Sequence, residues 1–209
     1  MIVAGDVPAV NAESPAMLTP HEEQIGSQIG FEKEILRIIK DEVNSPLHQL
    51  SGYDEDGYQV KVNGIVISSP QSKVEQVRVS LRNKLLPWKY MVFLVEVNEG
   101  TRIARIGIIK GTDQFEILNI MQTNGEPDDI THDDVIEKLR EWDKLYPFEI
   151  IGAENEWVEL EFKKLPRDVK AFAEDVYGFS PDTIDNGAGT INDLIAELKQ
   201  TRRVTLWWE

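Results

Sequence analysis

The 209-residue chain contains no cysteine. This absence excludes disulfide bridges, thiolate nucleophiles and cysteine-based zinc or iron–sulfur sites. Long hydrophobic runs are also missing, since no stretch approaches the roughly 20 apolar residues that cross a bilayer. The stretch 1–26 has no basic segment and only short apolar runs, unlike a secretory signal peptide. We therefore expect a cytoplasmic protein that does not bind a membrane.

Positive charge is scarce, because 22 Lys and Arg face 37 Asp and Glu, which gives a net charge of −15. Residues 58–112 carry nine basic and three acidic side chains, whereas residues 113–209 carry ten basic and 23 acidic ones. An acidic surface repels phosphate backbones, so we expect no nucleic acid partner. The same field attracts cations, and a basic protein is the partner that we expect.

Apolar residues make up 41% of the chain, which is enough to build a core. Apolar spacing of three and four residues predicts helices near residues 31–43, 74–85, 113–121, 132–142, 169–176 and 191–198. Alternating runs predict hairpins over residues 58–69, 90–110 and 148–164, the first turning at Asn63-Gly64. The fold class expected is α+β, with a mixed or mostly antiparallel sheet built from hairpins and helices packed on it.

A polar cluster at residues 52–57 suggests a boundary. We expect residues 1–57 to form an N-terminal arm and helix, and residues 58–209 to form a single α+β domain. Residues 90–153 and 148–208 both run hairpin, helix, helix, strand, so an internal duplication and a chance repeat are both open.

Two tryptophans almost end the chain, where large aromatic side chains are unusual. In a strand, Val204, Leu206 and Trp208 would share one face, and Trp207 would lie on the other. An indole on each face predicts a strand that is covered on both sides, inside the sheet and not at its edge.

Several short motifs of the C-terminal half occur in an order that is typical of one family. They are Gly152-Ala153 with Trp157, Leu165-Pro166, Ala171-Phe172-Ala173, Val176-Tyr177, Pro181-Asp182, Asp185-Asn186-Gly187, Gly189-Thr190 and Leu206-Trp207-Trp208-Glu209. Together with residues 134–143, they make about residues 105–209 resemble a bacterial family catalogued as domain of unknown function 4253. Ser180, Asn186 and Glu209 replace the Cys, Gln and Asp of the family pattern. The resemblance implies a fold and no activity.

The loop 178–189 is the first candidate site. Its glycines and the oxygen-bearing side chains of Ser180, Asp182, Asp185 and Asn186 could hold a hard cation, but their spacing does not match a calcium loop. The same residue types are typical of a tight turn, and on this interpretation no metal or other cofactor is expected.

The hairpin 148–164 is the second candidate, because Glu159 lies among other carboxylates close to Trp157. Paired carboxylates perform acid–base chemistry where burial shifts one pKa, but alternate glutamates are also typical of a solvated strand face. The three histidines show neither triad order nor metal spacing, and no phosphate-binding loop is present.

Two functions therefore remain open. The first is a non-catalytic binding module, with toxin-neutralising immunity proteins as an analogy of class only. The second is a metal-assisted hydrolase that uses carboxylates around the loop 178–189. Binding residues expected in either case are Trp157, Glu159, Ser180, Asp182, Asp185 and Asn186.

Overall fold

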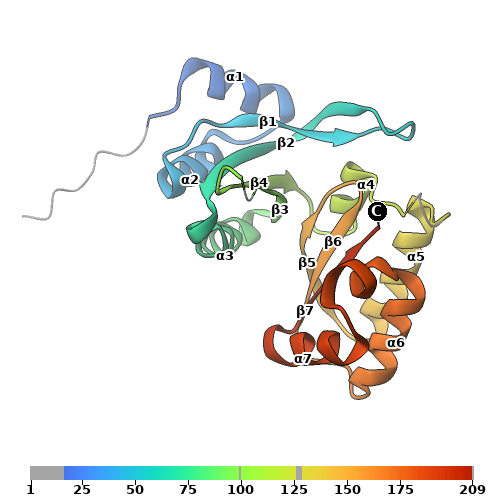
Figure 1. Cartoon of the computed structure of the whole chain (residues 1–209). Coiled ribbons are helices and arrows are strands. Elements are labelled where there is room, and N and C mark those ends of the chain that lie inside the picture. The colour runs from blue at the N-terminus through green and yellow to red at the C-terminus, as the bar shows by residue number, and fades with distance from the viewer. Residues whose placement is uncertain (1–16, 99, 126–128, 209) are drawn as a thin grey trace, which may run out of the picture.

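The computed structural model describes residues 17–98, 100–125 and 129–208, and it shows one sheet with helices on both faces (Figure 1). Seven strands lie in the order β1-β2-β4-β3-β5-β6-β7. They are β1 (His48–Tyr53), β2 (Gln59–Pro70), β3 (Tyr90–Asn98), β4 (Ile103–Lys110), β5 (Phe148–Ala153), β6 (Trp157–Phe162) and β7 (Arg203–Trp207). Neighbouring strands are antiparallel except β3 and β5, so the α+β class with a mixed sheet is confirmed.

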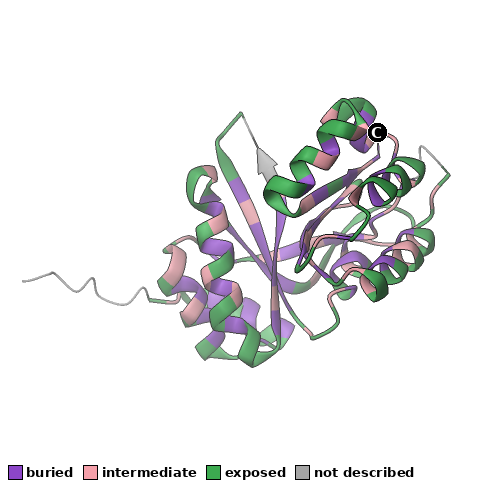
Figure 2. Cartoon of the chain, turned by 90° about the horizontal axis from the view of Figure 1, so that it is seen from below, coloured by how far each residue is buried: buried purple, intermediate pink, exposed green. Residues whose placement is uncertain are grey.

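Three helices cover one face of the sheet over β1 to β4: α1 (Pro20–Ile29), α2 (Lys33–Val43) and α3 (Val74–Leu85). Their apolar side chains pack on alternate residues of these strands, such as Val92 and Leu94 of β3. Alternate strand residues point to opposite faces, so Phe93 and Val95 of the same strand belong to the other core. Figure 2 shows this pattern as buried strands between helices with exposed outer faces.

The opposite face is covered by α4 (Glu116–Met121), α5 (His132–Leu145), α6 (Val169–Phe179) and α7 (Ile191–Thr201). Aromatic rings dominate this core, in which Trp142, Phe172 and Phe162 make edge-on contacts. Thr131 and Asp134 form a capping box at the start of α5, because each side chain accepts a hydrogen bond from the backbone N–H of the other residue. No helix in the described ranges is both long and apolar enough to span a bilayer.

The N-terminal region contains a helix that was not predicted from the sequence. Thr19 and Glu22 form a reciprocal capping box at the start of α1, and Pro20 occupies the first turn. The expected boundary after residue 57 falls in the turn between β1 and β2, which are paired antiparallel strands. The sheet and one apolar core therefore continue across that position.

The predicted hairpin turn at Asn63-Gly64 is wrong. Both residues lie inside β2, which pairs with β1 on one side and β4 on the other. Gly64 is needed there because a Cβ would lie 2.8 Å from Leu50 and 2.9 Å from Ile109. The chain turns instead at residues 54–57, where the Asp54 carboxylate accepts backbone N–H bonds from Asp56 and Tyr58.

The position of the terminal strand is also corrected, because β7 lies at the edge of the sheet. Val204, Leu206 and Trp208 are buried as predicted, but Thr205 on the other face is exposed and Trp207 is half-buried. Both predicted hairpin–helix–helix–strand stretches are present in order. Their pairing differs, since β5 joins β3 in parallel whereas β7 joins β6 antiparallel.

Candidate functional site

Ser180 and Thr183 close the outer edge of the sheet. The buried Ser180 hydroxyl donates to the Trp207 carbonyl at 2.7 Å and accepts from the Trp207 N–H at 3.2 Å. Thr183 donates to the Thr205 carbonyl at 3.1 Å. These hydroxyls take the hydrogen bonds that another strand would make with β7, so the predicted site residue Ser180 has a structural role.

The other polar residues of the segment 178–189, in which Thr183–Ala188 form a short π-helix, bind neighbouring side chains at the surface. The Asn186 amide donates to Asp182 at 2.8 Å, and the Tyr177 hydroxyl donates to Asp185 at 3.4 Å. Asp185 and Asn186 are exposed. Across the described ranges, no group of three or more His, Asp or Glu side chains is arranged to hold a metal ion.

Trp157 and Glu159 lie on the sheet face opposite the aromatic core, since Val158 and Leu160 between and after them point into that core. Burial raises the pKa of Glu159, and the positive charge of Arg203 offsets part of this shift. The Arg203 guanidinium lies 3.9 Å from the Glu159 carboxylate. Glu159 and the loop carboxylates thus have separate partners.

Glu159 belongs to an ion-pair network between α3 and the last strands. Arg78, which is 2% exposed, binds Glu75 with two bonds of 2.9 and 3.0 Å. Arg203 of β7 contacts Glu75 and also lies 3.2 Å from Glu161 of β6. Arg78 of α3 is therefore paired within the chain.

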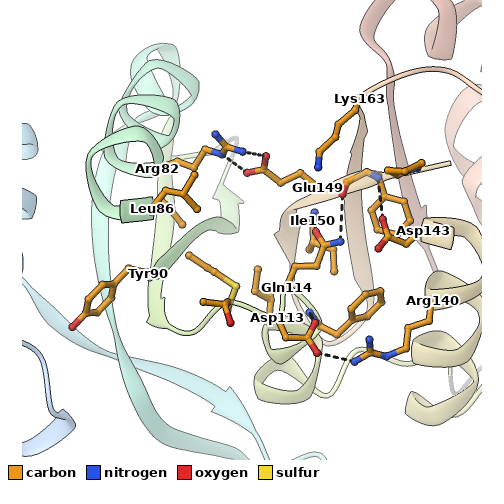
Figure 3. A pocket seen from close by; sticks show the side chains of 17 residues that line it. Arg82, Leu86, Tyr90, Asp113, Gln114, Arg140, Asp143, Glu149, Ile150 and Lys163 are labelled. Carbon is orange, nitrogen blue, oxygen red and sulfur yellow. Dashed lines mark hydrogen bonds and ion pairs between the residues drawn. The ribbon is translucent and has the colours of Figure 1, made fainter. Parts of the chain in front are cut away.

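A cleft of about 480 Å³ opens between the first residues of β3 and those of β5 (Figure 3). Arg82 forms a two-bond ion pair with Glu149 on one side of it. The Gln114 amide projects into the seam, where its nitrogen donates to the Phe148 carbonyl at 3.3 Å and its oxygen accepts from the Ile150 N–H at 2.9 Å.

Asp113, the residue before Gln114, anchors the loop that carries both residues. Asp113 accepts the Phe115 N–H at 3.1 Å and pairs with Arg140 at 2.9 Å. Burial tends to raise the pKa of Asp113, but the Arg140 and Phe115 hydrogen bonds outweigh it and lower that pKa. The anchored loop fixes the backbone position from which the Gln114 side chain projects.

A second cavity, of about 520 Å³, is acidic. We call it the acidic pocket. Its carboxylates are Asp54, Glu55 and Asp56 from the β1–β2 turn and Asp129 from the segment before α5. Its other side chains are polar apart from Ile130, and no Lys or Arg lines it among the described residues. None of the four carboxylates takes part in an ion pair in the described part of the chain.

A family model, domain of unknown function (DUF4253), matches residues 105–209, about half of the chain. The chain belongs to the DUF4253 family. Searches of curated proteins and of solved structures gave no match.

The DUF4253 segment does not form a continuous sheet by itself. It begins inside β4 and includes β5 to β7, but β3, which separates β4 from β5, precedes it in sequence. The cleft and the acidic pocket both combine DUF4253 residues with earlier ones: Gln114 with Tyr90, and Asp129 with Asp54. Earlier residues of this chain thus complete both cavities.

The sequence analysis missed both cavities because their residues meet only in the folded chain. The run of three acids at residues 54–56 is the one local signal, and in the sequence it belongs to the polar cluster that suggests a boundary. Nothing near Gln114 in the sequence marks it as a partner of β5. Of the six expected binding residues, Ser180 binds β7 and Glu159 lies 3.9 Å from Arg203. Trp157 lines a further cavity, together with Glu154 and Arg105.

Proposed function

We propose that this DUF4253 protein is a non-catalytic binding module and that its partner is a basic protein. The observation that supports this proposal is the acidic pocket, whose four carboxylates have no cationic partner among the described residues. Carboxylates that line a concave surface focus their field and raise the local concentration of cations. A Lys or Arg side chain of a partner would therefore fit this pocket.

Exposure in the acidic pocket favours association over catalysis. Glu55, Asp56 and Asp129 are exposed, so water solvates their carboxylates in the free protein. A general acid or base at neutral pH needs a shifted pKa, which burial would supply. An acidic rim suits recognition of a basic surface, and immunity proteins remain an analogy of class only. A cytoplasmic location is part of the same proposal.

The metal-assisted hydrolase finds no support in the described structure. The loop 178–189 uses Ser180 to hold β7, and its Asp182 and Asp185 each bind a neighbouring polar side chain. We therefore carry only the binding function forward.

A low-salt pull-down from host extract, followed by a salt titration, tests the proposal. Exposed charges are screened over about 10 Å at 0.1 M salt, so a partner held by the acidic pocket should be released as salt rises. The test variant is Asp54→Asn/Glu55→Gln/Asp56→Asn/Asp129→Asn. The matched control, Asp41→Asn/Glu137→Gln/Glu174→Gln/Glu197→Gln, removes the same charge from exposed positions elsewhere.

We expect the wild type and the control to retain the same basic protein and the pocket variant to lose it. A partner that is retained equally by the pocket variant would contradict the proposal, as would a specific chemical turnover by the wild type.

A further inference from the structure

The seam between β3 and β5 is open at its amino-terminal end. The two strands share one registered pair, Leu94 with Gly152. Residues 90–93 and 148–151 precede this pair within the same strands, and no registered partner joins them across the seam. The first half of β5 therefore has no strand partner on the side that faces β3, although β5 lies within the sheet. The cleft of Figure 3 lies along this unpaired side.

Side chains occupy the hydrogen-bonding groups of this edge. Gln114 binds the Phe148 carbonyl and the Ile150 N–H, and the Asp143 carboxylate accepts from the Phe148 N–H at 3.2 Å. A carbonyl at one residue and an N–H two residues later are the groups through which a parallel strand would pair with Glu149. The Gln114 amide thus mimics the peptide group of a neighbouring strand.

We propose that this cleft binds an extended peptide segment of another protein, whose backbone replaces the Gln114 amide on β5. Strand addition of this kind takes its affinity from main-chain hydrogen bonds and its specificity from alternate side chains. The cleft volume of about 480 Å³ lies within the range of ligand sites. A primary amide on a flexible side chain can leave β5 without unfolding either strand.

The two faces of the cleft determine which side chains the peptide carries at successive positions. A residue that pairs with Glu149 points its side chain to the same face, beside Arg82 and Lys163. Arg82 is bound to Glu149, whereas Lys163 has no ion pair within the described part of the chain, so this face favours an acidic side chain. The peptide residues on either side point toward the face of Phe148 and Ile150, which is apolar. The expected motif is apolar–acidic–apolar.

This site is distinct from the acidic pocket and does not rest on the proposed function. The acidic pocket selects basic side chains through charge, whereas the cleft selects an extended backbone with an acidic centre. The two sites share no lining residue. Variants at one therefore leave the other intact, and either proposal can fail alone.

The probe is an acetylated and amidated pentapeptide, Thr-Val-Glu-Val-Thr, titrated into the full chain by NMR. We expect shifts of the Ile150 backbone amide and the Gln114 side-chain amide, with slower hydrogen exchange at Ile150. The same peptide with an N-methylated central residue cannot donate to the Phe148 carbonyl, so we expect binding on the order of tenfold weaker. This comparison uses the wild type only, and it remains valid if a variant fails to fold.

Two protein variants sharpen the test. Gln114→Ala removes the competing amide, so we expect the peptide to bind on the order of tenfold more tightly. The bound peptide should also slow the hydrogen exchange of the Ile150 backbone amide, which has lost its Gln114 partner in this variant. Lys163→Glu should weaken binding of this peptide and favour a Lys-centred version, whereas Lys164→Glu, a control at an exposed neighbour outside the cleft, should change neither. The proposal is overturned if the N-methylated peptide binds equally well. It is also overturned if Gln114→Ala weakens binding, or if no peptide shifts Ile150.

Discussion

Replacing Ser180 by alanine removes the hydroxyl that closes the outer edge of the sheet. Ser180 is 0% exposed, and its oxygen makes one bond to the Trp207 carbonyl and another to the Trp207 N–H. In the variant the N–H keeps the Thr183 hydroxyl, which lies 3.3 Å away, but the carbonyl loses its donor. An unsatisfied buried polar group costs about 1–3 kcal/mol, so we expect the free energy of unfolding to fall by about 2 kcal/mol.

Urea denaturation followed by tryptophan fluorescence measures this loss of stability. Trp207 and Trp208 lie at the edge that Ser180 covers, so their fluorescence reports the unfolding of this edge. For a chain of this size, about 2 kcal/mol corresponds to a melting temperature lower by about 4–8 °C. Ser180→Cys should fall between alanine and wild type, since a thiol is a weaker hydrogen-bond donor than a hydroxyl. Asn186→Ala, at an exposed position of the same loop, should stay within about 0.5 kcal/mol of wild type. The role assigned to Ser180 is refuted if the free energy of unfolding of Ser180→Ala also lies within about 0.5 kcal/mol of wild type, with the same slope against urea concentration.

Deleting residues 204–209 removes all of β7 but Arg203, together with the fully buried Trp208. We therefore expect loss of the cooperative melt in calorimetry, and a near-native melt would show that the strand is dispensable. Gly125→Ala places a Cβ 2.6 Å from the Trp208 ring and should lower the free energy of unfolding by about 1–3 kcal/mol in urea, whereas an unchanged midpoint would contradict that packing. Burial tends to raise the pKa of Glu75, but hydrogen bonds from Arg78 and Arg203 lower it from 4.5 to about 2. Its charged form thus stabilises the fold above about pH 4.5, and this stabilisation is lost as the pH falls toward about 2. Glu75→Gln should therefore flatten the pH dependence of the free energy of unfolding in urea between these two values. An unaltered pH dependence would argue against the ion-pair network. Calorimetry with calcium, magnesium, manganese and zinc should show no tight binding to the loop 178–189, and a micromolar isotherm that Asp182→Asn abolishes would revive the metal-assisted hydrolase.

The helices that local chemistry specifies were predictable from the sequence. Thr131 with Asp134 marks the start of α5, and apolar spacing gives the inner face of α3. Thr19 with Glu22 is the same kind of signal, but it lies beside a Pro- and Ala-rich stretch and was interpreted as part of an arm. Most elements therefore followed from short-range patterns, whereas α1 and β1 did not.

The pairing of strands depends on contacts that no short stretch encodes. Asn63-Gly64 has the chemistry of a hairpin turn, yet pairing of β2 with two neighbours keeps it extended. The two tryptophans suggested an internal strand, but hydroxyls from a distant loop cover the edge of β7 instead. The cleft and the acidic pocket were unpredictable for the same reason, since their residues come from segments that are far apart in sequence.

The most direct test of the binding function is an NMR titration of the full chain with an acetylated and amidated tetra-arginine peptide at low salt. The account predicts shifts concentrated at the acidic pocket, in residues 54–57, 129–132 and 155, that disappear in the Asp54→Asn/Glu55→Gln/Asp56→Asn/Asp129→Asn variant. Shifts that are spread evenly over the acidic helices α5 to α7, or shifts that persist in that variant, would contradict it.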